Sequence, residues 1–377
     1  MQTPQPTFKQ LTQRTADEIA SHRRVLGTTE YALDLREFIA SRIPNFRQPD
    51  QEALAAFAKV NESVRQRSGE TALGTWLPLA GLTRDLTATT ASSLVTGTKG
   101  SDAAGGLLPA SAVLGGGATV LSGLRGTDYS IPTVGADLDI AGGWIDEGES
   151  IPAIDPSFGL ASLTPKVLAV QVVVSRRLLM NATVDVDALI RRELALRIGH
   201  AIDLAAINGD GVKQPLGLLR ASDLDVIAAG TNGLAPTYAH VVDAEYRVAT
   251  RAGADGQRFS WLMSPKLAKR LRTTSRLSGQ DGFILEGLDL LGYPVRLSPQ
   301  VPDNLTKGTA DGVCSALLFG DMTEIVVGFW GPAAVDVLVD GVTLAKDAKV
   351  RIIARAMVGV TPRRIGSFAA FKDLLAA

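Results

Sequence analysis

The sequence predicts an α+β protein built from more than one subdomain. Three observations support this prediction: alternating runs rich in β-branched residues at 129–175, a long helical pattern at 184–208, and helices interspersed with strands after residue 220. At 377 residues the chain exceeds the size at which a single hydrophobic core usually stops growing. We therefore expect two or more subdomains.

Composition and charge exclude several classes of protein. The formal net charge is −1 with no basic block, so the chain carries no electrostatic footprint of a sequence-specific nucleic-acid binder. Cys314 is the only cysteine, which excludes an internal disulfide and a multi-cysteine zinc site and favours folding in a reducing cytoplasm. No run approaches the roughly 18 apolar residues of a membrane helix. The first ten residues, MQTPQPTFKQ, lack the apolar core of a signal peptide.

The first 80 or so residues predict short amphipathic helices. The patterns lie at 31–43 and 50–67, with Asp50 as a plausible N-cap of the second and prolines at 44 and 49 between them. A boundary is expected near residues 75–92. From Asp85 to Tyr129 the chain is rich in Thr, Ser, Ala and Gly and cannot build its own core. Composition leaves two interpretations open, a disordered linker or an extended arm ordered by neighbouring subunits.

The strands at 129–175 include a long hairpin whose tip is acidic, at Asp146 to Glu149. A two-stranded ribbon is only marginally stable alone in water. If the hairpin projects, a second subunit is its natural cover. The alternative, a hairpin folded back on its own domain, is the commoner arrangement in an arbitrary protein.

The strongest helical pattern follows, with about 22 residues and a length of roughly 33 Å. It ends at the turn signal Asn208-Gly209-Asp210-Gly211. Its apolar stripe comprises Val186, Leu189, Ile190, Leu194, Ile198, Ala201, Ile202 and Ala205. Beyond residue 220 we expect helices at 238–253 and 265–274, and strands at 259–264, around 290–298, and at 316–322, 324–330, 335–340 and 349–361.

No catalytic, cofactor or metal site is predicted. The histidines, His22, His200 and His240, are widely spaced, and His200 is read as a structural or surface residue beside Asp203. The serine-hydrolase pattern G-x-S-x-G is absent, and Cys314 lies in an apolar strand typical of an inert buried thiol. The glycines at 115–117 lack a phosphate-binding context, and the acidic hairpin tip lacks EF-hand spacing. These absences favour a structural or binding protein over an enzyme.

The order of motifs in the middle of the chain is similar to that of HK97-type major capsid proteins of tailed bacteriophages and prophages. It comprises Ile131-Pro132, GGWIDEGESIP at 142–152, the strand and helix at 158–194, and AIDLAAINGDGVKQPLGLL at 201–219. Three of its motifs are specific in combination: the Trp-x-x-Glu segment, the Ser-x-x-Leu-Leu after a strand and the Asn-Gly-Asp-Gly…Pro-x-Gly turn. The likeness extends over roughly residues 84–373.

The resemblance implies an HK97-type capsid fold without enzymatic activity. Residues 171–219 and 341–377 would form a peripheral domain with a long spine helix and a β-sheet, and residues 220–340 an axial domain. Residues 91–128 would form an extended N-terminal arm, and residues 129–170 a projecting β-hairpin, the E-loop. Residues 1–90 would be a helical scaffold-like segment, which a phage protease removes in many relatives.

The resemblance also implies homo-oligomeric partners. Subunits would form pentamers and hexamers that close an icosahedral shell around double-stranded DNA, held without sequence specificity. Portal protein, and also decoration protein or maturation protease, are further expected partners; no membrane is expected. The protein would assemble in the host bacterial cytoplasm and reside in the virion.

The E-loop suggests candidate contacts between subunits. Some relatives join subunits by an isopeptide bond from an E-loop lysine, but no lysine occurs here between Lys99 and Lys166. Salt bridges from the acidic tip are the expected substitute. The candidate contact residues are Trp144, Asp146, Glu147 and Glu149 on the hairpin and Arg176, Arg177, Arg191 and Arg192 beyond it.

Two alternatives stay open at this point. An encapsulin-like compartment shares the fold and stores cargo enzymes in place of a genome; neighbouring portal and terminase genes would distinguish the two. A hydrolase or maturation protease fused to a capsid is disfavoured, because residues 1–90 hold only His22 and few catalytic pairs.

Overall fold

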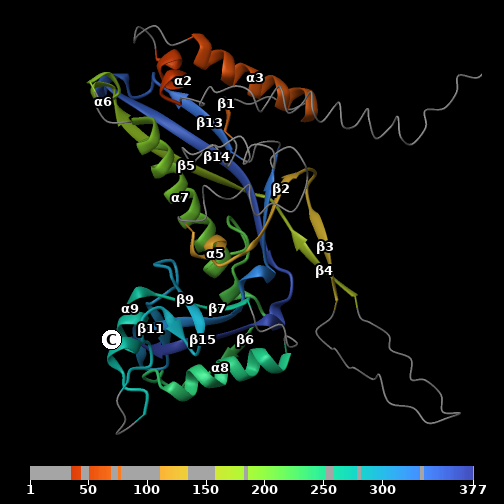
Figure 1. Ribbon diagram of the computed structural model, residues 1–377, viewed down its shortest axis with the longest axis vertical. Helices are drawn as coiled ribbons and strands as arrows, with labels where there is room; N and C mark the ends of the chain where they lie inside the picture. The colour runs from red at the N-terminus through yellow and green to blue at the C-terminus, as the bar shows by residue number, and fades with distance from the viewer. Residues whose placement is uncertain are drawn as a thin grey trace, which may run out of the picture. The chain divides into compact units, whose positions relative to one another are not determined.

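The computed structural model describes residues 35–43, 51–68, 75–77, 111–134, 158–181, 186–251, 258–277, 282–331 and 335–376. The chain forms two compact units (Figure 1). Unit 1 comprises residues 1–106, 169–195 and 331–356, and unit 2 comprises residues 107–168, 196–330 and 357–377. Both contain helices and strands, so the α+β fold class is confirmed. Among the helices described, none combines the length and the apolar character that crossing a bilayer requires.

Unit 1 holds the N-terminal helices on a small sheet. Its elements are α2 (Leu35–Arg42), α3 (Gln51–Ser68), β1 (Thr75–Leu77), α6 (Arg176–Asn181), β13 (Val335–Asp340) and parts of β5 (Lys166–Ser175), α7 (Val186–Asn208) and β14 (Lys349–Pro362). β1 pairs antiparallel with β13, which pairs antiparallel with the first half of β14. The two predicted N-terminal helices are confirmed. The proposed cap, Asp50, lies outside the described residues.

Apolar contacts hold α2 and α3 in unit 1. The rings of Phe38 and Phe57 lie 5.2 Å apart between their centroids, and both side chains are buried together with Ile39 and Ile43. The hydroxyl of Thr75 on β1 donates a hydrogen bond to Asn61 on α3. So short a pair of helices cannot bury enough surface to fold alone, and its stability comes from packing on the sheet.

Unit 2 is built around a seven-stranded sheet of order β6-β15-β11-β7-β9-β8, with β10 paired to β11. The strands are β6 (Asp225–Ile227), β7 (Phe259–Met263), β8 (Asp289–Leu290), β9 (Tyr293–Leu297), β10 (Leu305–Lys307), β11 (Ala310–Asp321) and β15 (Phe368–Leu375). Helices α8 (Tyr238–Arg251) and α9 (Pro265–Thr273) pack against it (Figure 1). The aromatic rings of Phe259, Trp261, Tyr293 and Phe319 meet in the core.

The last strand departs from the sequence-based domain plan. Residues 341–377 were expected together, beside the long helix, but β15 pairs antiparallel with β11 and parallel with β6. Phe368, Phe371 and Leu374 are buried in that sheet. The residues of β15 are buried on both faces of the strand, so it contributes to the core of unit 2 from either side of the sheet.

The described part of the expected N-terminal arm also differs from the prediction. α5 (Ala112–Gly115) is a short helix, and β2 (Thr119–Leu124) pairs parallel with β12 (Ile325–Trp330). Val113, Leu114 and Val120 are buried. This part of the segment is thus ordered by residues far along its own chain. On its other edge β12 pairs antiparallel with the second half of β14.

Helix α7 is confirmed, with 23 residues that end at Asn208. Ile190, Leu194, Ile198, Ile202 and Ala205 are buried, as the apolar stripe predicts. Leu189 is an exception, because its side chain is 53% exposed. The stripe therefore becomes accessible at the N-terminal end of the helix.

Candidate interaction surfaces

A two-stranded ribbon is the most exposed regular element of unit 2. β3 (Tyr129–Val134) pairs antiparallel with β4 (Phe158–Leu163), in register from Tyr129 opposite Leu163 to Val134 opposite Phe158. The two strands run side by side as a separate sheet in Figure 1. Within the described residues neither outer edge of this ribbon is paired to a third strand. The predicted strands that flank the hairpin are observed, while the hairpin with its acidic tip at 146–149 lies outside the described residues and stays a prediction.

One face of the ribbon is open and the other is anchored. Ser130, Pro132, Leu160 and Ser162 share the open face, and the side chain of Leu160 is 74% exposed. On the opposite face Leu163 is fully buried against Val326 and Trp330, and Ile131 packs on the same cluster. The ribbon is therefore fixed at its base and presents free backbone edges with an apolar side chain, which is the arrangement used for strand addition.

The eight predicted contact residues fall into four groups by their exposure. Trp144, Asp146, Glu147 and Glu149 lie outside the described residues. Arg191 on α7 is only 5% exposed, and its role in a contact between subunits stays a prediction. Arg176 is half-buried, and its backbone N–H donates to the carbonyl of Ala348. Arg177 and Arg192 are exposed and remain candidates.

The turn that closes α7 is held rigidly by its glycines. A Cβ on Gly209 would lie 2.0 Å from the carbonyl oxygen of Pro215, and one on Gly217 would lie 2.2 Å from the backbone nitrogen of Gly209. Real side chains never approach backbone so closely, so only glycine fits at these positions. The Asn-Gly-Asp-Gly…Pro-x-Gly pattern is thus explained by the close approach of two backbone segments.

The carboxylate of Asp210 organises the same turn. Its Oδ1 accepts hydrogen bonds from the backbone N–H groups of Val212, Lys213 and Gln214 at 2.9, 3.0 and 2.9 Å. These bonds lower the pKa of Asp210, because they favour its charged form. The Lys166 ammonium donates to the carbonyl of Val212 at 3.0 Å, which joins the turn to the start of β5.

Sequence reasoning missed the buried carboxylate of Asp203 on α7. Its oxygens accept hydrogen bonds from the Ser111 hydroxyl and from the backbone N–H groups of Ala112 and Val113 at 2.8 and 3.1 Å. The Ser298 hydroxyl donates to it at 3.4 Å. Burial raises the pKa of Asp203, although the hydrogen bonds oppose the rise. The sequence did carry a signal for this buried group, namely a single acidic residue in the apolar face of the helix. His200, three residues earlier, is exposed.

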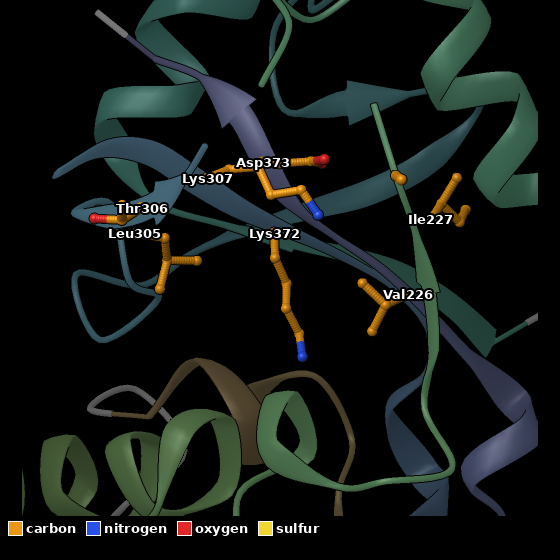
Figure 2. Close-up of a pocket in the computed structure, with 8 residues that line it drawn as sticks. Val226, Ile227, Leu305, Thr306, Lys307, Lys372 and Asp373 are labelled. Atoms are coloured by element: carbon orange, nitrogen blue, oxygen red, sulfur yellow. The ribbon is translucent and has the colours of Figure 1, made fainter. Parts of the chain in front are cut away.

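A pocket of about 310 Å³ opens between strands of unit 2 (Figure 2). It is lined by Val226, Ile227, Ala228, Leu305, Thr306, Lys307, Lys372 and Asp373. The carboxylate of Asp373 is engaged in structure, since it accepts from the N–H of Ala229 at 3.0 Å. Burial lowers the pKa of Lys372. These residues include no nucleophile paired with a base, so the pocket resembles a structural gap more than an active site.

The remaining reactive groups occupy structural positions. Cys314 is fully buried in β11, and burial, with Asp373 nearby, raises the pKa of its thiol, as expected of an inert cysteine. The ring of His240 packs on Phe371 at 5.4 Å between centroids, and burial lowers its pKa. Over the part of the chain that the structure describes, no cluster of three His, Cys, Asp or Glu residues could hold a metal ion.

Comparison with known proteins identifies relatives. A family model described as the phage capsid family matches residues 105–373, well over half of the chain. The chain is 28% identical over 359 residues to a protein named major capsid protein of Halomonas phage phiHAP-1, covering 91% of this chain and 55% of that protein. It therefore spans about half the length of this curated relative.

Solved structures share the fold. The capsid proteins of a native and of an empty GTA particle each align with a TM-score of 0.53 and 22% identity, covering 70% of this chain and 90% of theirs. At this identity the likeness shows the fold alone. Together with the family model over residues 105–373, it confirms the resemblance noted in the sequence: the chain belongs to the phage capsid family, a family of structural proteins.

Proposed function

We propose that this chain is a major capsid protein that self-assembles into pentamers and hexamers of an icosahedral head shell of a tailed phage. Membership of the phage capsid family supports shell formation. The single structural observation that carries the proposal is the β3–β4 ribbon, whose outer edges pair with no other strand among the described residues and whose open face carries Leu160 at 74% exposure. A protein stable as a monomer would cover or blunt such edges.

Each part of the chain has a role in this proposal. The ribbon is the base of the E-loop (129–170), α7 is the spine helix, and the seven-stranded sheet forms the body of the axial domain. The E-loop covers a neighbouring subunit and adds backbone hydrogen bonds there. Residues before 111 act as arm and scaffold-like segment.

The partners follow from the same proposal. The shell encloses double-stranded DNA, and a net charge of −1 is compatible with this because packaged DNA carries its own counterions. Portal protein is a further partner of the shell, together with decoration protein or maturation protease. The particle assembles in the bacterial cytoplasm and the protein ends in the virion.

The first experiment is expression of the full chain alone, followed by negative-stain electron microscopy. Closed shells of uniform diameter are the expected result. Small soluble species under a range of salt and crowding conditions, also after co-expression with the neighbouring phage genes, would refute self-assembly.

The acidic tip can be tested by charge reversal and rescue. Replacing Glu147 and Glu149 by lysine should weaken assembly, because their salt bridges to arginines of a neighbour would become repulsive. Adding Arg177→Glu and Arg192→Glu, the two exposed candidates, should restore it. Normal shells from the first variant would show that the tip makes no such pairs.

A further inference from the structure

The pocket between β6, β10 and β15 holds a positive charge for which the described residues provide no counter-charge. Lys372 lines this pocket of about 310 Å³ and is half-buried (Figure 2). Among the described residues its ammonium has no hydrogen-bond or ion-pair partner, and burial lowers its pKa without any contribution from a carboxylate. A partly desolvated ammonium with no anion beside it is unfavourable, because burial penalises its charged form.

The carboxylate that lines the pocket does not neutralise Lys372. Asp373 is the next residue of β15, and successive residues of a strand point to opposite faces of the sheet. Both its oxygens accept from the backbone N–H of Ala229, at 3.1 and 3.0 Å. In Figure 2 the side chains of Asp373 and Lys372 leave the strand in different directions. The carboxylate therefore holds the segment after β6, and the ammonium is left to the pocket.

The walls beside Lys372 are apolar and partly open to solvent. Val226 lies on the same face of the sheet, since its partner on β15 is Ala370, two residues before Lys372. The Val226 side chain is 42% exposed. Leu305 of β10 is half-buried, and Figure 2 shows the Lys372 side chain extending between Leu305 and Val226. The pocket thus combines a central charge with apolar surface on both sides of it.

A second lysine adds to the positive charge of the pocket. Lys307, at the end of β10, also lines it and is exposed. The acidic residue that precedes Val226, Asp225, is already paired: its carboxylate lies 3.3 Å from Arg247 and 2.9 Å from Arg251, both on α8. The lining therefore offers two ammonium groups and one carboxylate that is bonded elsewhere, which favours an anion.

We propose that this pocket binds a small organic anion, whose carboxylate or phosphate head lies at the Lys372 ammonium and whose apolar body lies against Val226 and Leu305. The site is a binding site without a catalytic pair, and it goes beyond the proposed shell function and does not depend on it. Small-molecule sites are commonly pockets of about 300–1,000 Å³ with mostly apolar walls and a few polar groups that orient the ligand. A charge-assisted hydrogen bond from the lysine would replace the lost hydration of its ammonium.

Calorimetric titration of the full chain at pH 7 tests the proposal with two probes, hexanoate and hexyl phosphate. Both have an anionic head and an apolar body. Hexylamine, which is cationic at this pH, and acetate, which lacks the apolar body, are the matched ligands. We expect at least one probe to bind at one site per chain, roughly tenfold or more tighter than acetate, and we expect no binding of hexylamine.

Substitutions locate the site. Lys372→Met keeps the apolar stem and removes the charge, so it should weaken binding of the probe by roughly tenfold or more without lowering the midpoint of thermal unfolding. Lys269→Met is the matched control and should bind as the unsubstituted chain does, because Lys269 is exposed on α9 and does not line the pocket. Val226→Glu supplies a carboxylate within the pocket and should compete with the ligand.

A footprint provides the independent measurement. Acetylation of Lys372 by an N-hydroxysuccinimide ester, followed by mass spectrometry, should slow in the presence of the probe, while Lys269 keeps its rate. The proposal is overturned if neither probe binds, if Lys372→Met binds as well as the unsubstituted chain, or if hexylamine binds as tightly as hexanoate. Protection of Lys372 by a DNA duplex and by neither probe would overturn it as well, because the site would then be a nucleic-acid contact.

Discussion

Removing the carboxylate of Asp203 should release the segment that begins at Ser111 from helix α7. In the unsubstituted chain the backbone N–H groups of Ala112 and Val113 donate to the Asp203 carboxylate at 2.8 and 3.1 Å, and in Asp203→Ala they lose this acceptor. Each unpaired buried donor costs about 1–3 kcal/mol. Relief of the buried charge offsets part of this, so we expect a loss of about 2–4 kcal/mol in the free energy of unfolding.

Hydrogen exchange of residues 111–124, followed by mass spectrometry on unassembled subunits at pH 7, measures this effect directly. The segment should lose protection in Asp203→Ala before the rest of unit 2 does. Asp243→Ala is the control, since Asp243 forms an exposed i,i+4 pair with Arg247 at 3.5 Å and should change stability by less than about 0.5 kcal/mol. Wild-type protection of the segment in Asp203→Ala would refute the assigned role.

The pH dependence of the same site has a definite sign. Because burial raises the pKa of Asp203 above its ordinary value of 3.8, the folded chain binds this proton more tightly than the unfolded chain. The stability that this group contributes is therefore complete at a pH below 3.8, and it is lost as the pH rises through the pKa of the folded state. Asp203→Asn does not titrate, so the stability of the wild type relative to this variant should fall across that window. A constant difference between pH 3.5 and pH 7 would contradict the argument.

Three further predictions concern other parts of unit 2. Gly217→Ala should lower the midpoint of thermal unfolding by many degrees, because its Cβ would lie 2.2 Å from the nitrogen of Gly209; an unchanged midpoint would show that the turn can adjust. Arg363→Ala should cost about 1–3 kcal/mol in denaturant unfolding, since it strips two hydrogen bonds of 2.7 and 2.8 Å from the buried Glu324, and Arg363→Lys should recover only part of the loss. Thiol reagents should modify Cys314 only after unfolding, and native labelling would disprove its burial.

Elements whose apolar residues recur with a clear helix or strand period could be predicted from the sequence, and elements buried on both faces could not. Helix α8 and strand β14 follow their apolar patterns closely, and α7 does so at Ile190, Leu194, Ile198 and Ile202. Strand β15 shows no alternation of apolar and polar residues, because both of its faces are buried in the core. A run such as FAAFKDLL does not distinguish a strand from a helix.

The segment at 111–124 was difficult for a different reason. Its glycines, alanines and serines suggest a chain without a core, yet Val113, Leu114, Ala118 and Val120 are buried. The groups that order it come from far along the sequence: Asp203 caps α5, and β12 pairs with β2. Local composition cannot predict partners that lie about 90 and 200 residues away.

The surfaces that matter for assembly depend on the same distinction. Val212 and Val342 follow identical Asp-Gly dipeptides and have nearly equal exposure, yet Asp210 accepts three backbone N–H groups and Asp340 accepts two. The turn at Val212 is also held by a tertiary bond, from the Lys166 ammonium to the carbonyl of Val212. In a protein that must remain monomeric, an apolar side chain on so rigid a turn would favour unwanted association. In a subunit of a shell the same feature is useful, because a contact repeated in every copy needs only a modest gain in each to stabilise the closed assembly.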